Sequence, residues 1–168
     1  MGMQLIETIE VGSGGAASIE FTSIPQDGVD LILLLSLRDT TSDSDRSVKL
    51  TLNSDSSSSY PRLWLTGDGS IAQSGGNTQT YLFAGQTNAA TSTSNTFGNI
   101  QIYLSNYTSS SNKSASVDAV YENNATEAKQ YLIADTYQNS TGISSILIDS
   151  DGNFVQYSTA SLYLISAD

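Results

Sequence analysis

The chain has 168 residues, the length of one ordinary domain, and it is strongly acidic, with 17 Asp and Glu against 6 Lys and Arg and a net charge of -11. This charge disfavours nucleic-acid binding, because proteins that bind DNA or RNA neutralise phosphates with Lys and Arg. The sequence contains no Cys and no His, which excludes thiol nucleophiles, imidazole bases, disulfides and Cys/His zinc sites.

Alternating and β-branched runs recur between clusters of Gly, Ser, Asn and Asp, a pattern that predicts strands throughout and no long helix. Eight to ten strands are expected from the candidate runs, which in chain order are residues 4–11, 17–21, 29–37, 48–52, 62–65, 81–83, 97–104, 115–121, 131–137, 145–148 and 154–165, the last broken near Ser158. Around the run at 81–83, residues 66–96 are small and polar, and we expect an irregular segment there.

These runs fit one all-β domain over residues 1–168, a single antiparallel β-sandwich of jelly-roll-like type with long Ser/Thr/Gly-rich loops. Sequence periodicity does not separate a jelly roll from an immunoglobulin-like sandwich. Residues 1–15 are expected to form an N-terminal arm or an edge strand. The alternation predicts a buried core made of Leu31, Leu33, Leu35, Val48, Leu50, Leu52, Ile100, Ile102, Leu104, Ile146 and Ile148.

The run at 29–37 is the most apolar segment of the chain, yet it is too short for a membrane helix. A sandwich buries one face of each strand, so the outward side chains of this apolar run need another cover. Either a segment of the same chain or a neighbouring subunit supplies it, and exposed apolar patches usually mark interfaces. We therefore predict a homo-oligomer interface at Leu31, Ile32, Leu33, Leu34 and Leu35.

The stretch from Asp149 to Asn153 resembles the first half of a calcium loop, with oxygen ligands on Asp149, Asp151 and Asn153 and a turn-forming Gly152. The second half is missing, because Ala160 stands where such a loop needs a bidentate glutamate. A hairpin turn is the expected structure, and these three residues are a weak calcium candidate.

No arrangement of residues predicts a catalytic site. None of the lysines forms a motif with a serine that indicates a nucleophile and its base, and with 17 carboxylates some close pair is inevitable without a glycosidase cleft. We expect no enzymatic activity and no cofactor. Trp64 and the nine tyrosines offer stacking platforms for sugars, which keeps glycan binding as an alternative.

Several short segments between about residues 5 and 165 carry a likeness to a known family: Ile24-Pro25-Gln26 before Asp30-Leu31, Arg38 at the end of the apolar run, residues 50–53 followed by Asp55 and Tyr60, Asn106-Tyr107 then Lys113, and Ser161-Leu162-Tyr163. With these segments the chain resembles short virion proteins of tailed bacteriophages, of the capsid decoration (cement) or tail-fibre type. The resemblance implies a structural protein that assembles as a symmetric oligomer on a virus particle. Two positions depart from that pattern: Leu164 stands where a glycine is expected, and Gly28 where an aromatic residue is frequent.

The resemblance further implies a homotrimer on the outer capsid surface of a virion, bound to the major capsid protein. The acidic charge and the lack of a long apolar run predict no nucleic-acid and no membrane partner. Residues 1–37 contain five acidic residues and no Lys or Arg, so Glu7, Glu10 and Glu20 are the expected contacts to a basic patch on the capsid. The alternative is a tail-fibre or receptor-binding module whose β-sandwich binds glycans.

Overall fold

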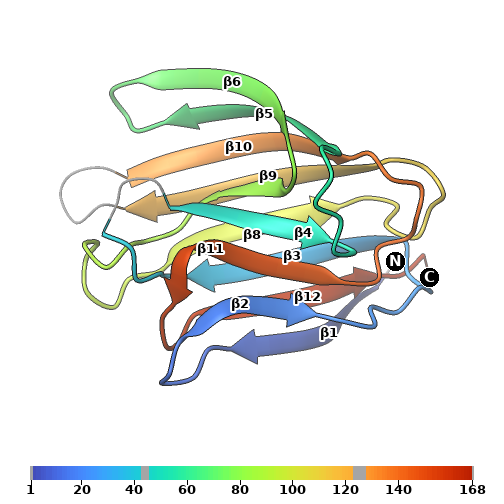
Figure 1. The fold of residues 1–168 in the computed structure, drawn as a ribbon, viewed down its shortest axis with the longest axis horizontal. Helices are drawn as coiled ribbons and strands as arrows, with labels where there is room; N and C mark the ends of the chain where they lie inside the picture. The colour runs from blue at the N-terminus through green and yellow to red at the C-terminus, as the bar shows by residue number, and fades with distance from the viewer. Residues whose placement is uncertain (1, 43–45, 123–127, 168) are drawn as a thin grey trace.

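The computed structural model describes residues 2–42, 46–122 and 128–167, which fold into two sheets packed face to face (Figure 1). Twelve strands lie in these ranges: β1 (Met3–Glu10), β2 (Ala16–Phe21), β3 (Asp30–Leu37), β4 (Ser47–Leu52), β5 (Tyr60–Gly67), β6 (Ala72–Gln79), β7 (Leu82–Gln86), β8 (Gly98–Leu104), β9 (Lys113–Glu122), β10 (Ala128–Tyr137), β11 (Ile146–Phe154) and β12 (Thr159–Ile165). The described ranges contain no helix, and so none that could cross a membrane.

The larger sheet has eight strands in the order β1-β12-β3-β8-β9-β10-β5-β6, and the smaller has four in the order β2-β11-β4-β7. Neighbouring strands within each sheet are antiparallel. The smaller sheet covers the central strands of the larger one, whereas β5 and β6 extend beyond it (Figure 1). The predicted all-β antiparallel sandwich is confirmed.

The core lies between the sheets and follows the predicted alternation. All eleven side chains expected in the core from strand periodicity are at most 2% exposed. Phe21, Tyr60, Tyr107, Tyr137 and Phe154 add the largest buried rings, each also at most 1% exposed. Since successive residues of a strand point to opposite faces, the period of two in β3, β4 and β8 is enough to build this core.

The expected count of eight to ten strands is wrong, as is the irregular segment at 66–96. β5 continues to Gly67 and β6 occupies residues 72–79 with the sequence AQSGGNTQ. Every residue of β6 is exposed or half-buried, so this strand needs no apolar alternation and leaves no hydrophobic signal.

The first residues form an edge strand, because β1 lies at one end of the larger sheet and pairs with β12. A turn closed by the Gly15 N–H donating to the Gly12 carbonyl (3.0 Å) leads to β2 in the other sheet. Gly15 has a φ of 69°, which glycine adopts without strain.

A buried arginine organises the long loop between β7 and β8. Arg38 is 9% exposed, and its guanidinium donates four hydrogen bonds of 2.7–3.2 Å to the carbonyls of Ala90, Ser92, Thr93 and Thr96. All four acceptors are backbone carbonyl oxygens of the loop. The loop therefore closes around the charge, and Arg38 supplies hydrogen-bond donors to its backbone carbonyls.

The two departures from the phage virion pattern lie against each other. A methyl group built on Gly28 would lie 2.5 Å from Cγ of Leu164 and 2.8 Å from both of its terminal methyl carbons. Leu164 is 6% exposed and faces the core from β12. The leucine thus fills space that a side chain at position 28 would otherwise occupy.

Candidate functional site

Exposed leucines gather on the outer face of the larger sheet, the face turned away from the smaller sheet. Leu63 and Leu65 of β5 stand directly opposite Ala134 and Leu132 of β10. The side chain of Leu63 is 68% exposed, that of Leu65 58% and that of Leu132 50%. We call these four residues the leucine groove.

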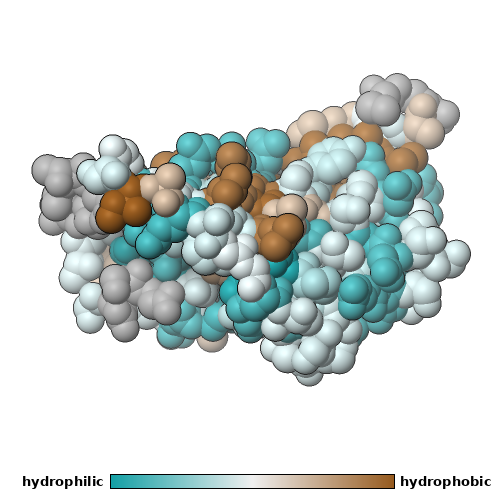
Figure 2. Space-filling view, turned by 90° about the horizontal axis from the view of Figure 1, so that it is seen from above, coloured by the Kyte–Doolittle hydropathy of each residue, from teal (hydrophilic) through white to brown (hydrophobic). Residues whose placement is uncertain are grey.

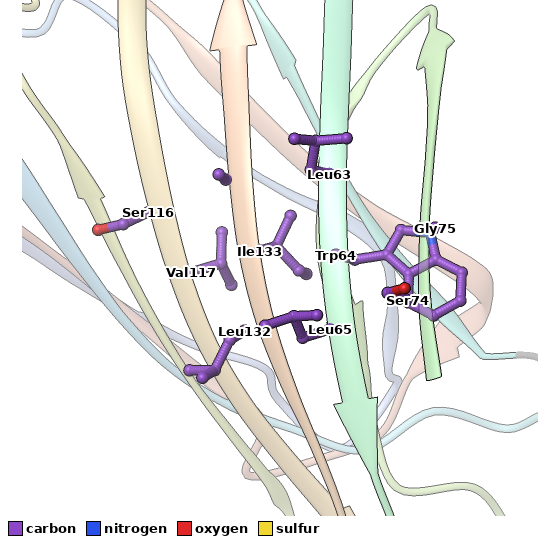
Figure 3. Close-up of a pocket in the computed structure, with 10 residues that line it drawn as sticks. Leu63, Trp64, Leu65, Ser74, Gly75, Ser116, Val117, Leu132 and Ile133 are labelled. Carbon is purple, nitrogen blue, oxygen red and sulfur yellow. The ribbon is translucent and has the colours of Figure 1, made fainter. Parts of the chain in front are cut away.

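The groove is a hollow of about 640 Å³ whose remaining lining includes Ser74 of β6 and Ser116 of β9. Figure 3 shows Leu63, Leu65 and Leu132 gathered over β5 and β10, with Ser116 to one side and Ser74 to the other. A second hollow of about 510 Å³ shares Leu65 and Leu132 and continues the groove toward Gly67 and Ala72. The surface is therefore a long, open and mainly hydrocarbon trough along the strands.

Two glycines of β6 shape the wall of the groove. A methyl group on Gly75 would lie 2.5 Å from the Trp64 ring, and one on Gly76 would lie 2.5 Å from Cδ2 of Leu63. Trp64 and Leu63 alternate along β5, so the ring packs on one face of β6 and the leucine on the other. Bare backbone at these positions allows both side chains to lie flat against the strand.

No residue lining either hollow carries a titratable side chain. Acid–base or nucleophilic chemistry needs such groups within hydrogen-bond reach of a substrate. The groove can bind an apolar surface, but its described lining offers no group that could catalyse a reaction.

The predicted oligomer interface is wrong for three of its five residues. Leu31, Leu33 and Leu35 are at most 2% exposed because they face the smaller sheet, so they cannot meet another subunit. Ile32 and Leu34 point outward, as expected, and Ile32 is half-buried between Tyr103 and Tyr163 on the adjacent strands. Leu34 remains 38% exposed.

The three acidic residues expected to contact a capsid are all exposed. Glu7 and Glu10 lie on β1 and Glu20 on β2, and each of these strands is the first in its sheet's order. Glu7 and Glu10 therefore occupy the opposite end of the larger sheet from the β5–β6 pair that carries part of the leucine groove, and Glu20 lies on an edge strand of the smaller sheet.

The weak calcium candidate is not assembled as a metal site. Asp151 forms a salt bridge of 2.5 Å with Lys49 and accepts the Ser47 N–H at 2.9 Å. Burial raises the pKa of Asp149, with Lys49 opposing that shift. Over the described ranges no group of three or more Asp and Glu residues is placed to hold a cation.

The expected hairpin turn at 149–153 is also wrong. These residues belong to β11, which pairs with β2 and β4 and shifts its register to β2 between Asp149 and Phe154. The segment is therefore an irregular part of a strand. It is not a hairpin turn, because β11 and the following β12 lie in different sheets and do not pair with each other.

The leucine groove was missed from sequence, although a signal for it exists. Leu63-Trp64-Leu65 is apolar on both faces of a strand, as is the run from Leu31 to Leu35. In β5 the inward Trp64 is half-buried while both outward leucines are exposed. An apolar run on both faces of a strand therefore indicates an exposed apolar surface when the strand lies near a sheet edge.

A buried carboxyl lies on the reverse side of the sheet, next to the groove residue Ala134. Asp135 is 2% exposed and accepts hydrogen bonds from the Phe83 and Thr136 N–H groups. Burial raises the pKa of this carboxyl to about 6, and the N–H groups and Arg62 only partly oppose the shift.

The raised pKa predicts that the protein becomes more stable on mild acidification. Below pH 6 the folded state binds a proton at Asp135 that the unfolded state, with a pKa near 3.8, does not yet bind. We expect the free energy of unfolding in urea to rise by about 1–2 kcal/mol from about pH 7.5 to about pH 5. Asp135→Asn should remove most of this rise, and an equal rise in that variant would show that another group is responsible.

Below that range the trend reverses. Hydrogen bonds from Ser57, more than from Asn139 and Tyr137, lower the pKa of Asp55 to about 2. A carboxyl with a lowered pKa stabilises the fold above its unfolded pKa and loses that contribution as the pH falls toward the folded value. Stability is therefore expected to be greatest at mildly acidic pH.

No family model matches this chain, and no curated protein matches it. A crystal structure of the galectin LEC-6 from Caenorhabditis elegans is similar to the chain with a TM-score of 0.39 and 14% sequence identity. The alignment covers 92% of this chain and 94% of the galectin chain.

Proposed function

We propose that the protein is a non-enzymatic structural protein of a phage virion, a decoration (cement) protein on the outer capsid surface that binds the major capsid protein. The observation that carries the proposal is the leucine groove, three leucines that are at least half exposed on one sheet face. Contiguous exposed apolar side chains of this kind are typical of protein–protein contact surfaces.

The lining of the groove favours a protein surface over a sugar as its occupant. Glycan sites combine an exposed aromatic ring with several polar groups that fix the hydroxyls. Here the single tryptophan, Trp64, is half-buried against Gly75, and the polar side chains in the larger hollow are Ser74 and Ser116, with Gln73 and Gln130 in the hollow that continues it. The glycan-binding tail module is therefore the weaker alternative.

The charge of the chain supports an outer location. A protein with a net charge of -11 is repelled by packaged DNA, which disfavours the capsid interior. The exposed Glu7 and Glu10 on β1 and Glu20 on β2 remain available to complement basic residues of a capsid protein.

Capsid binding by purified protein tests the proposal. We expect Leu63→Ser/Leu65→Ser to lower the affinity for decoration-free capsids at least about tenfold, because two leucine side chains lose their apolar contact. Leu34→Ser is the matched control, since Leu34 is exposed on the same sheet face but lies on β3, outside the groove. Sedimentation of capsids with bound protein measures both variants.

Equal binding of the double variant and the wild type would exclude the groove as the contact. Cryo-electron microscopy of the virion tests the location independently. A decoration protein occupies capsomer positions in many copies, and density confined to the tail would overturn the capsid assignment in favour of the tail module.

A further inference from the structure

The strand β6 is the outermost strand of the larger sheet, at the top of the molecule in Figure 1. Among the described strands it has β5 as its hydrogen-bonded neighbour, and the eight residue pairs of that ladder run without a register shift. Its other edge pairs with no strand of the described ranges and so presents free N–H and C=O groups toward them. Such an edge is a template for another strand.

Natural sheets usually protect their edges with charges, prolines or bulges, and β6 has none of these. Its residues are Ala, Gln, Ser, Gly, Gly, Asn, Thr and Gln. The opposite edge of the same sheet is protected, because β1 carries Glu7 and Glu10 and shifts its register between Leu5 and Glu7. The two edges of one sheet are therefore unequal in their readiness to pair.

Charge indicates a second copy of this chain as the strand that pairs with β6. Two copies with a net charge of -11 each repel one another over most of their surfaces. The uncharged β6 is a place where they can meet without opposing carboxylates. The charged side chain that hydrogen-bonds to β6 is a cation: the Arg62 guanidinium donates to the side-chain oxygen of Asn77 at 2.8 Å.

The surface around β6 is suited to a contact between strand edges. Figure 2 looks onto the molecule from the β6 side and shows mostly hydrophilic and intermediate residues, with hydrophobic side chains in separate groups. A contact here would be made by backbone hydrogen bonds between strands, with small side chains allowing close approach, rather than by one large apolar patch.

We propose that the protein forms a homodimer in which β6 of two copies pairs antiparallel, joining the two larger sheets into one continuous sheet. The two-fold axis of such a pair is perpendicular to the sheet, so a residue on the outer face of one copy lies on the outer face of the other. Residues directly opposite one another share a face, and one residue must therefore stand opposite its own copy on the axis. The longest overlap within residues 72–79 places that residue at Gly75 or Gly76. Both leucine grooves then face the same side of the dimer.

With Gly76 on the axis, Ser74 of one copy stands opposite Thr78 of the second copy. Ser74 and Thr78 are exposed and lie on the outer face. Like charges directly opposite one another destabilise antiparallel pairs. The variant Ser74→Glu/Thr78→Glu therefore places four carboxylates along the contact, whereas Ser74→Lys/Thr78→Lys places four ammonium groups there.

Light scattering after size-exclusion chromatography is the test. The wild type is expected to have the mass of a dimer, and the glutamate variant should dissociate at concentrations at least about tenfold higher than the wild type does. Mixing the glutamate and lysine variants should restore dimers that contain one copy of each. This rescue shows direct contact, which a folding defect would not reproduce.

The matched control is Leu5→Glu/Thr8→Glu on the protected edge β1, where both side chains lie on the outer face opposite Tyr163 and Ser161, and it should remain dimeric. Fluorescence of the single Trp64, which packs on Gly75 of β6, reports that every variant is folded. A wild-type monomer at high concentration, a trimer, or dissociation caused by the β1 control would overturn the proposal. None of these outcomes affects the groove test, so the two proposals can fail separately.

Discussion

Replacing Arg38 by methionine lowers the free energy of unfolding by about 3–5 kcal/mol, the largest effect we expect from one polar substitution. Methionine retains an apolar stem of similar shape but leaves the carbonyls of Ala90, Ser92, Thr93 and Thr96 without the donor that now reaches them. An unsatisfied buried acceptor costs about 1–3 kcal/mol. The total stays below four such penalties, because the Thr93 carbonyl keeps the Thr96 N–H and hydroxyl as donors and because Ala90 and Thr93 are exposed to water.

Urea denaturation followed by Trp64 fluorescence measures this effect. Arg38→Lys should recover little of the loss, because an ammonium group has three donors and lacks the planar fork that reaches four carbonyls. Arg62→Met is the comparison, because among the described residues its guanidinium donates to the Asn77 side chain and lies over the Phe83 ring but reaches no backbone carbonyl, so a smaller loss is expected. A loss below about 1 kcal/mol for Arg38→Met would mean that water replaces the guanidinium around the loop.

The pair Gly28 and Leu164 should show strong coupling in a double-mutant cycle. Gly28→Phe alone drives an aromatic ring into Leu164, whose Cγ already lies 2.5 Å from the position of an added methyl group. Leu164→Gly alone empties a core site that is 6% exposed. We expect each single change to destabilise the protein by about 3–5 kcal/mol.

The double variant Gly28→Phe/Leu164→Gly should be considerably more stable than the sum of the two single changes predicts. The ring can then occupy the volume that the leucine vacates, and the coupling free energy is expected to exceed about 2 kcal/mol. Additive losses in chemical denaturation would show that the backbone at position 28 does not direct a side chain into this space.

This contact bears on the phage virion resemblance. The chain departs from that pattern at both positions, with Gly28 in place of an aromatic residue and Leu164 in place of glycine. The structure brings the two positions together, so one departure compensates for the other in volume. The double-mutant cycle tests this compensation directly, and it assigns no functional role to either residue.

The sandwich core was predictable because period-two alternation is a local property of the sequence. Leu50 and Leu52 in β4 and Ile100 and Ile102 in β8 face inward as their spacing requires. The break near Ser158 was also predictable and is confirmed, since β11 ends at Phe154 and β12 begins at Thr159.

The leucine groove and the β6 edge depend instead on which strands become neighbours. Alternation shows that Leu63 and Leu65 share a face, but not that Leu132 and Ala134 lie beside them or that this face is outermost. Likewise, the β6 sequence has the composition of a loop. It forms a strand because the ladder to β5 satisfies its backbone, a cause that lies outside the strand itself.

The place of β3 in the larger sheet determines the order in which the protein can fold on the ribosome. This most apolar strand lies between β8 and β12, and β12 is the last strand of the chain to be synthesised. During translation β3 can gain β8 on one side while its other edge stays open until synthesis of β12 is complete. Nascent chains therefore carry an uncovered apolar strand from the synthesis of β3 to that of β12, which makes prolonged chaperone engagement the expected biosynthetic cost of this topology.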